Sequence, residues 1–290
     1  MGKSDLALDL AIRFEGEVIN GDSRQVYRGF DIGTDKPTPQ DRRRVRHHLL
    51  DVTEPEQRFS AADFARLATE AAFSILERGH LPIVVGGSGL YLKALVDGLF
   101  PGPGRDDETR RCLHREAEAR GLEGLYRRLA EADPAYARKI NPRDEVRIIR
   151  ALEVLSLTGV PLSEHFRRTE SFLKDVQTVK IGLKLDRKEL NKRINDRVDR
   201  MFERGLVEEV RALLGRSVPP DAPAFQALGY RHVFSYFKKD VTLEQAKDLT
   251  RQDTRRFAKR QMTWFRKMPG VTWFEAGEPQ AVADFVRSRL

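Results

Sequence analysis

Residues 81–89 read LPIVVGGSG, and this stretch decides the fold class of the 290-residue chain. A short apolar run that ends in glycines is typical of a buried strand followed by a loop. A second run, EVIN at residues 17–20, ends just before the loop that contains Asp22, and apolar residues at helical spacing cover residues 4–14 and 60–78. Strands that alternate with helices predict an α/β fold with a parallel sheet, in which ligands bind at the carboxyl ends of the strands.

The first residues of the chain, MGKS, match the end of a phosphate-binding loop. The full pattern is G-x-x-x-x-G-K-[ST] between a strand and a helix, and Gly2, Lys3 and Ser4 fill its last three positions. Backbone donors and the lysine of such a loop bind phosphate groups. We expect the first strand and the start of this loop to be missing from the sequence, and the chain to fold or work poorly as a result. The tripeptide alone also fits a flexible N-terminus with a capping serine.

Composition and charge narrow the class of protein. Hydrophobic residues make up 40% of the chain, which is enough for a sizeable core, and the net charge of +8 favours a polyanionic partner. The single cysteine, Cys112, allows no disulfide framework within the chain, so a reducing compartment fits. The sequence contains no apolar run long enough to span a bilayer. We therefore expect a cytoplasmic protein without a membrane segment, and we expect it to be a monomer.

The pattern changes after the PGPG stretch at residues 101–104. Residues 105–169 have helical patterns throughout and are dense in charge, whereas residues 176–185 predict a strand that returns to the sheet. Residues 190–214 then predict one long helix with a buried apolar stripe. These patterns indicate a core interrupted by a helical insertion. The predicted domains are a core of residues 1–104 and 176–290, which includes C-terminal basic helices, and an insertion of residues 105–175.

Cations and aromatic residues gather in one helical stretch near the C-terminus. Cations neutralise phosphates and aromatic rings stack on splayed bases, so this stretch indicates nucleic-acid binding. The alternative is an ordinary helix whose aromatic rings face the core and whose cations are solvated. The stretch contains Arg251, Arg255, Arg256, Lys259, Arg260, Arg266 and Lys267, with Phe257, Trp264 and Phe265 among them.

Several motifs follow one another from residue 2 to about residue 268. Taken in order, they resemble the tRNA dimethylallyltransferase family, also called tRNA isopentenyltransferases. Each motif is modest evidence, but the ordered set is highly specific and covers nearly the whole chain. The resemblance implies a P-loop-kinase-like parallel sheet core with a helical insertion domain. The motifs after GKS are GDSRQVY at 21–27, DIGTDKP at 31–37, HHLLD at 47–51, GGSGLY at 86–91, RIIRALE at 147–153 and QMTWFR at 261–266.

The resemblance implies an enzyme that transfers a dimethylallyl group from dimethylallyl pyrophosphate to the exocyclic N6 amine of the adenosine 3′ to the anticodon in tRNA. The product is N6-dimethylallyladenosine, and Mg²⁺ is the implied cofactor, bound to the pyrophosphate. An adenine amine is a poor nucleophile that must lose a proton, and Asp22 matches the carboxylate that accepts it. Lys3 and Ser4 match the loop that binds the leaving pyrophosphate, with the Ser4 hydroxyl near the metal. Ser88 matches a catalytic position that contacts the substrates.

The resemblance also implies which residues contact the anticodon stem-loop of tRNA. Specific RNA recognition favours such loops, and chemistry on a base requires that the base is extruded. Val146 departs from the family, which more often has glutamine there, and His232 stands where the family often has glutamate, so we assign it no role. The implied contacts are Asp22, Ser23, Arg24, Gln25 and Ser88 around the adenine, Arg110, Val146, Arg147, Ile148, Ile149 and Arg150 in the insertion, and Arg260, Gln261, Trp264 and Arg266 near the C-terminus.

Two other functions stay open on the sequence alone. A non-catalytic tRNA-binding relative would bind tRNA without turnover. A small-molecule P-loop kinase shares the GKS start and the parallel sheet, but it does not explain residues 21–27 or the basic aromatic stretch. Loops of this kind bind ATP in many enzymes. The implied reaction needs no ATP, because the pyrophosphate of the prenyl donor would occupy the place of the nucleotide phosphates.

Overall fold

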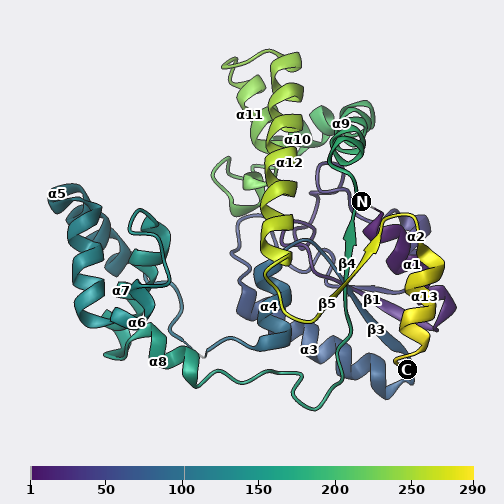
Figure 1. The fold of residues 1–290 in the computed structure, drawn as a ribbon. Helices are drawn as coiled ribbons and strands as arrows, with labels where there is room; N and C mark the ends of the chain where they lie inside the picture. Colours follow the sequence, from purple (N-terminus) through teal and green to yellow (C-terminus); the bar gives the residue numbers. More distant parts are fainter. Residues whose placement is uncertain (1, 101) are drawn as a thin grey trace. The chain divides into compact units, whose positions relative to one another are not determined.

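The computed structural model describes residues 2–100 and 102–290, and Figure 1 shows its fold. The chain forms two compact units, one made of Met1–Val96 and Asp175–Leu290 and the other of Asp97–Lys174. The strands named below belong to the first unit, and the second unit is built from helices and their connections. The predicted α/β class with parallel strands is confirmed.

A three-stranded parallel sheet lies at the centre of the first unit. β1 (Gly16–Asn20) is the middle strand, with β2 (His47–His48) on one side and β3 (Leu81–Val85) on the other. Val18 and Ile19 of β1 are buried, as expected for a parallel strand that is covered on both faces. β3 departs from the prediction of a buried strand: it is half-buried along its length, because within the described residues it lies at an edge of this sheet.

Two longer helices pack on this sheet. α1 (Lys3–Arg13) buries its alanine residues in a cluster with Val18. α3 (Ala61–Glu77) begins with the predicted capping box, in which the side chains of Ser60 and Asp63 accept each other's backbone N–H groups. Two shorter helices of this unit are α2 (Pro39–Arg44) and α4 (Gly89–Asp97).

The strand predicted at residues 176–185 is observed as β4 (Lys180–Lys184), but its pairing differs from the prediction. Among the described residues, β4 pairs with β5 (Val271–Glu275) in a separate two-stranded parallel sheet and does not return to the first sheet. Apolar side chains join the two sheets instead of ladder hydrogen bonds. The shared cluster includes Leu10, Leu81, Ile83, Ile181 and Phe274, with Val282 and Val286 from α13 (Pro279–Arg287).

Residues 190–214, predicted as one helix, form parts of two. α9 (Arg187–Glu203) ends before Gly205, which has a φ of 96°, and α10 (Leu206–Gly215) follows it. A positive φ interrupts a right-handed helix and costs least at glycine. The apolar stripe continues across the break, so the spacing of apolar residues gave no sign of it.

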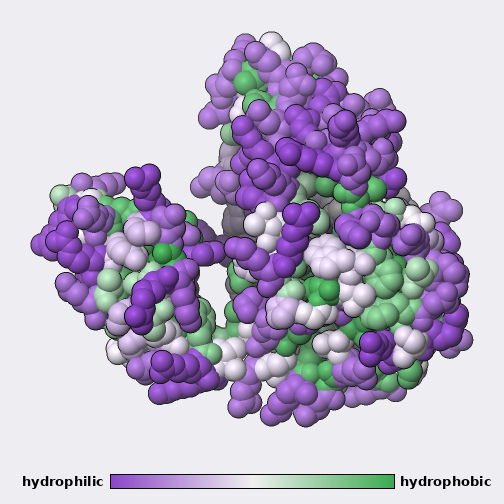
Figure 2. Space-filling model, in the orientation of Figure 1, coloured by the Kyte–Doolittle hydropathy of each residue, from purple (hydrophilic) through white to green (hydrophobic). Residues whose placement is uncertain are grey.

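A helical layer encloses the loop that follows β1. α10 packs with α11 (Tyr230–Phe237), and α11 packs with α12 (Leu243–Phe265) and a 3₁₀ helix at Pro223–Gln226. The fully buried rings of Phe30 and Tyr230 meet in the core of this layer, with their centroids 4.6 Å apart. Figure 2 shows hydrophilic side chains over most of the visible surface of these helices. The loop after β1 is thus held inside a second apolar core.

The second unit has its own apolar core. The helical character predicted for residues 105–169 is confirmed, apart from a kink at Gly121 and short connections. Leu125, Leu129, Ile148 and Leu152 are buried together in this core. Among the helices that the structure describes in either unit, none has the length and apolar character needed to cross a membrane. The helices of the second unit are α5 (Asp107–Ala132), α6 (Pro134–Ala137), α7 (Glu145–Thr158) and α8 (Leu162–Arg167).

A buried carboxylate anchors the start of β1. Glu17 is 4% exposed, and its carboxylate contacts the rings of His48 (2.6 Å) and His80 (3.0 Å) and accepts hydrogen bonds from Arg78 (2.9 Å). Burial acts to raise the pKa of Glu17, but these hydrogen bonds outweigh it and lower the pKa to about 2. The ionised carboxylate therefore stabilises the fold.

Replacing Glu17 by glutamine should destabilise the protein at pH 7 by about 3 kcal/mol, the free energy that corresponds to this pKa shift. Because the pKa is lower in the folded state, the stabilisation is present above the ordinary value of 4.5 and is lost as the pH falls towards 2. Urea unfolding at several pH values measures the free energy of unfolding. The difference in this free energy between the parent chain and Glu17→Gln should become smaller in acid. Glu77→Gln, at an exposed position, is the control. A difference in unfolding free energy that does not change with pH would contradict the lowered pKa of Glu17.

Candidate active site

A buried asparagine joins the loops that follow β1 and β2. Asn20 is 3% exposed, and its Nδ2 donates hydrogen bonds to the carbonyl oxygens of Leu49 (2.9 Å) and Asp22 (3.2 Å). Its Oδ1 accepts a hydrogen bond from the N–H of Asp22 (3.0 Å). Both polar groups of the Asn20 amide therefore hold the backbone of Asp22 at the carboxyl end of the sheet.

The two oxygens of the Asp22 carboxylate have different roles. Oδ1 accepts a hydrogen bond from the N–H of Arg24 (2.8 Å), which is the turn-capping role that an acid commonly plays after a strand. Among the residues that the structure describes, no donor is hydrogen-bonded to Oδ2. Asp22 is half-buried, so its free oxygen can still meet a ligand. A positioned carboxylate with one free oxygen is a candidate general base.

Lys3 lies within electrostatic reach of the Asp22 carboxylate and of a second cation. Burial and the charge of Arg197 on α9 lower the pKa of Lys3, while the negative charge of Asp22 acts in the opposite direction. The Nε of Arg197 is buried and has no hydrogen-bond partner among the described residues, and its Nη1 lies 3.8 Å from the carboxylate of Asp35. A buried donor without a partner, close to a lysine, is suited to binding an anion.

The start of α1 adds a helix N-terminus to these cations. Gly2 has a φ of 70° and precedes the helix, and Ser4 is exposed in its first turn. Backbone N–H groups at a helix N-terminus favour phosphate groups. Within residues 2–100 and 102–290, no group of three or more His, Cys, Asp or Glu side chains is placed to hold a metal ion. A magnesium ion here would depend on Ser4, on phosphate oxygens of a ligand and on water.

The loop after β3 lies directly against the loop after β1. A Cβ atom on Gly86 would overlap with the backbone of Gly21, so this close approach requires glycine. The N–H of Ser88 donates to the Gly21 carbonyl (3.3 Å), and the Ser88 Oγ accepts a hydrogen bond from the N–H of Ser23 (2.9 Å). The glycine-rich loop therefore supports Ser23 and, next to it in sequence, Asp22.

Arg24 and Gln25 lie at the site, but their side chains are bonded within the protein. The Arg24 Nη1 donates to the carbonyl oxygen of Pro223 (3.0 Å). The Gln25 Nε2 donates to the carbonyl oxygens of Thr34 and Asp35 (both 3.0 Å). Both side chains thus stabilise the loop, and contact with a tRNA would have to use their remaining atoms.

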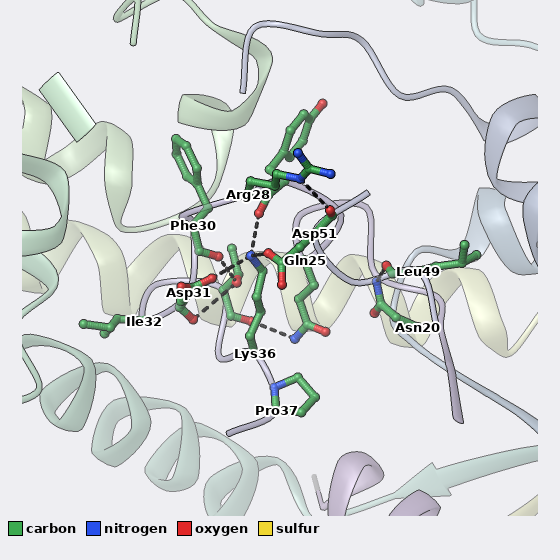
Figure 3. A network of polar contacts seen from close by, with 12 residues as sticks. Asn20, Gln25, Arg28, Phe30, Asp31, Ile32, Lys36, Pro37, Leu49 and Asp51 are labelled. Atoms are coloured by element: carbon green, nitrogen blue, oxygen red, sulfur yellow. Dashed lines mark hydrogen bonds and ion pairs between the residues drawn. The ribbon is translucent and has the colours of Figure 1, made fainter. Parts of the chain in front are cut away.

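A buried lysine holds the same loop together (Figure 3). The side chain of Lys36 is 2% exposed, and its Nζ donates to the Tyr27 carbonyl (2.5 Å) and to the carboxylates of Asp31 and Asp51 (both 2.6 Å). Burial acts to raise the pKa of Asp51, but hydrogen bonds from Lys36 and Arg42 lower it below its ordinary value. All three ammonium hydrogens of Lys36 have acceptors, so its charge is compensated.

Part of the basic C-terminal stretch is structural. The Arg251 Nε donates to Asp199 (3.0 Å), and the Arg255 Nη1 donates to Asn195 (2.6 Å), so both arginines tie α12 to α9. Arg260 and Arg266 are exposed and stay available to an anion. For Arg251 and Arg255, the structure therefore favours the alternative of an ordinary packed helix over a nucleic-acid contact.

Gln261 and Trp264, on the same helix, face the loop after β3. The Gln261 Nε2 donates to the Gly87 carbonyl (2.8 Å). The Trp264 ring lies against Gly89 and is 37% exposed. Both side chains were predicted to contact tRNA, and the structure shows that each is engaged by the protein itself.

In the second unit, a buried glutamate orders two of the predicted tRNA contacts. Glu153 is fully buried and accepts hydrogen bonds from Arg110 (2.8 and 2.9 Å) and Arg150 (2.7 Å). Burial acts to raise the pKa of Glu153, but the two arginines lower it to about 2. Arg110 and Arg150 therefore have structural roles in this unit.

The other predicted contacts of the second unit differ sharply in exposure. Val146 is 74% exposed, and Arg147 is exposed next to Asp144. Ile148 and Ile149 are 0% and 2% exposed, because both side chains lie in the core of this unit. The side chains of Ile148 and Ile149 therefore serve the core, and contact with a tRNA at these positions would have to use backbone atoms.

Comparison with known proteins identifies the family. The family model described as IPP transferase matches residues 25–268. This chain belongs to the IPP transferase family. A relative named tRNA dimethylallyltransferase, from Geobacter sulfurreducens, is 48% identical over 275 residues, which cover 94% of this chain and 88% of the relative.

Solved structures of IPP transferases agree with this assignment. A full-length tRNA isopentenylpyrophosphate transferase from Bacillus halodurans is 40% identical, with a TM-score of 0.72 over 99% of this chain and 92% of that one. A eukaryotic dimethylallyltransferase, described as acting on tRNA, is 28% identical, with a TM-score of 0.83 over 100% of this chain and 77% of that one. The resemblance found in the ordered motifs and the P-loop-kinase-like fold class are therefore confirmed.

The sequence analysis did not predict a functional role for Arg197. Arg197 is three residues after Ile194 and one before Val198, which are buried on the same helix. A cation on the apolar stripe of an amphipathic helix is the signal that could have revealed it. Its position near Lys3 depends on the packing of α9, which the sequence pattern does not give.

Replacing Lys36 by methionine should destabilise this IPP transferase by about 3 kcal/mol, because it leaves the facing carboxylates of Asp31 and Asp51 without their shared cation. Urea unfolding measures this loss. Arg43→Met, at an exposed position nearby, is the matched control and should stay within about 0.5 kcal/mol of the parent. Equal effects of the two substitutions would contradict the role given to Lys36.

Proposed function

We propose that this chain transfers a dimethylallyl group from dimethylallyl pyrophosphate to the N6 amine of the adenosine 3′ to the anticodon in tRNA. Its family membership and the names of its relatives support this reaction. The observation that carries the proposal is the free oxygen of Asp22 at the carboxyl end of β1, beside Lys3, whose charge interacts with both Asp22 and Arg197. A base and an anion site are thus close together, as prenyl transfer to an amine requires.

The proposed reaction is a substitution at the first carbon of the prenyl group. The N6 nitrogen forms a bond to this carbon, while the carbon–oxygen bond to pyrophosphate breaks and its electron pair leaves with pyrophosphate. The amine proton passes to the Asp22 Oδ2. The backbone of Asp22 is held by Asn20 and that of Ser23 by Ser88, so the base is positioned before the substrate binds.

The proposed pyrophosphate site consists of the start of α1 and the facing side of α9. Gly2 and the backbone at the start of α1 would bind oxygens of the leaving group, and Lys3 and Arg197 would compensate the charge that gathers there. The exposed Ser4 hydroxyl fits one ligand position of Mg²⁺, which when bound would neutralise part of the pyrophosphate charge.

Among the predicted contacts, we propose direct contact with tRNA for four exposed side chains and for two half-buried serines beside Asp22. We propose that the enzyme acts in the cytoplasm, where its tRNA substrate is found, and that it acts as a monomer. Arg24, Gln25, Arg110 and Arg150 are proposed to act mainly by ordering their segments, since their side chains are already bonded. The proposed direct contacts are Ser23, Ser88, Val146, Arg147, Arg260 and Arg266.

Replacing Asp22 by asparagine should lower the rate of transfer by roughly 10²–10⁴-fold, the usual contribution of a general base. The measurement uses labelled dimethylallyl pyrophosphate, Mg²⁺ and unmodified tRNA, followed by digestion of the RNA to find the labelled nucleoside. The affinity for tRNA should stay within about threefold of the parent, because asparagine keeps the shape and the turn-capping oxygen of the side chain.

The same assay separates the proposal from its alternatives. Label on the adenosine amine with the parent chain, and its loss with Asp22→Asn, support the proposal. If the parent chain binds tRNA but transfers no label to it, the non-catalytic tRNA-binding function would be favoured. Transfer of phosphate from ATP to a small acceptor would favour a kinase.

Replacing Arg197 by glutamine should raise the KM for dimethylallyl pyrophosphate by roughly 10–100-fold, since a hydrogen bond to a charged group contributes about 1.5–3 kcal/mol. The affinity for tRNA should not change. Arg200→Gln, at an exposed position on the same helix, is the matched control. An unchanged KM for the prenyl donor in Arg197→Gln would remove Arg197 from the proposed site.

A further inference from the structure

The loop after β3 lies between two parts of the first unit. On one side it touches the backbone of Gly21, at the end of β1. On the other side it touches α12, through Gln261 and Trp264, which are three residues apart and so share one face of the helix. The loop therefore contacts both that face of α12 and the loop that carries Asp22.

The contact with α12 is tightly fitted at two glycines. A Cβ atom on Gly87 would overlap with the Gln261 Nε2, and a Cβ atom on Gly89 would overlap with the indole of Trp264. The Gln261 Nε2 fills this space and donates a hydrogen bond to the Gly87 carbonyl (2.8 Å). Helix α12 thus binds the backbone of the loop directly, at positions on both sides of Ser88.

A short chain of bonds continues from this contact to the candidate base. Gln261 holds Gly87, the next residue is Ser88, and the Ser88 Oγ accepts the hydrogen bond from the N–H of Ser23 (2.9 Å). Ser23 follows Asp22 in sequence. A change in the position of the Gly87 carbonyl would therefore move the acceptor that orients the Asp22 loop.

Helix α12 is itself fixed to the other half of the proposed site. Arg251 and Arg255 bind side chains on α9, the helix that carries Arg197. Helix α12 thus contacts both α9, which carries Arg197, and the loop at residues 86–89, which supports the Asp22 loop. This arrangement can set the distance between the base and the anion site.

We propose that Gln261 is a positioning residue: through the Gly87 carbonyl it fixes the loop at residues 86–89, and through Ser88 it aligns Asp22 for proton transfer. This inference rests on the function proposed above. It replaces the role of a tRNA contact that the resemblance implied for Gln261. Its side chain acts through the loop and does not touch the substrates.

The primary variant is Gln261→Met, which keeps the length of the side chain and removes the donor. Hydrogen exchange should become at least about threefold faster in peptides that contain residues 21–25 and 86–90, because the bonds that protect them open more often. The kcat of transfer should fall by roughly 10–100-fold, as expected when a catalytic group is misplaced, while the Kd for tRNA stays within about twofold. Thr263→Ala, at an exposed position on the same helix, is the control and should change none of these values.

A second variant tests the contact from the other side. Gly87→Ala introduces the Cβ atom that overlaps with Gln261 and so should displace its amide from the carbonyl. It should reproduce the exchange and kcat effects of Gln261→Met, and the double variant should be no worse than either single variant, since both break one contact. Additive effects would overturn the proposal.

Two further outcomes separate this inference from the proposed function. A weaker affinity for tRNA in Gln261→Met, with unchanged hydrogen exchange, would make Gln261 an RNA contact and overturn the positioning role. Absence of transfer by the parent chain would count against the proposed function. In that case, faster exchange at both loops would still support the link from α12 to the Asp22 loop, and unchanged exchange would reject it.

Discussion

The close contact between the backbones of Gly21 and Gly86 is the constraint on which the candidate site depends. β1 and β3 are neighbouring parallel strands, so the loops after them leave the sheet at the same edge. They can share hydrogen bonds only if no side chain separates them, and glycine at both positions satisfies this condition. Asp22, Ser23 and Ser88 owe their common position to it. Lys3 of α1, which interacts electrostatically with both Asp22 and Arg197, then lies near a carboxylate whose backbone is fixed.

Many polar side chains of this structure are bonded within the protein. Asp22 caps its own turn with one oxygen and leaves the other free, while Arg110 and Arg150 satisfy a buried glutamate in the second unit. Lys36 compensates two carboxylates and a carbonyl from inside the loop. Many charged groups in each unit are therefore part of the scaffold. Near the proposed site, and among residues 2–100 and 102–290, the Arg197 Nε and the Asp22 Oδ2 have no hydrogen-bond partner. Groups without a partner near a site are the ones expected to meet a ligand.

The sequence predicted the features that depend on local pattern. The parallel α/β class, the capping box at Ser60 and the position of Asp22 at a strand end all follow from spacing and residue type within a few positions. The break at Gly205 was missed because the apolar stripe passes through it, and the separate pairing of β4 was missed because pairing joins distant residues. Arg197, and the internal bonds of Gln25 and Gln261, also depend on contacts between distant segments. Ordered motifs predicted the candidate site, but they did not show which side chains hold its loops together.

The glycines after β3 impose different constraints on the evolution of the chain. At position 86 the neighbouring atoms belong to the backbone of Gly21, which no substitution can remove, so a larger residue would always displace the loop. At position 87 the neighbouring atom is the end of the Gln261 side chain, which can be replaced by a shorter one. A larger residue at 87 can therefore be accommodated only alongside a change at 261. These two positions are expected to vary together among relatives, whereas position 86 should not vary at all.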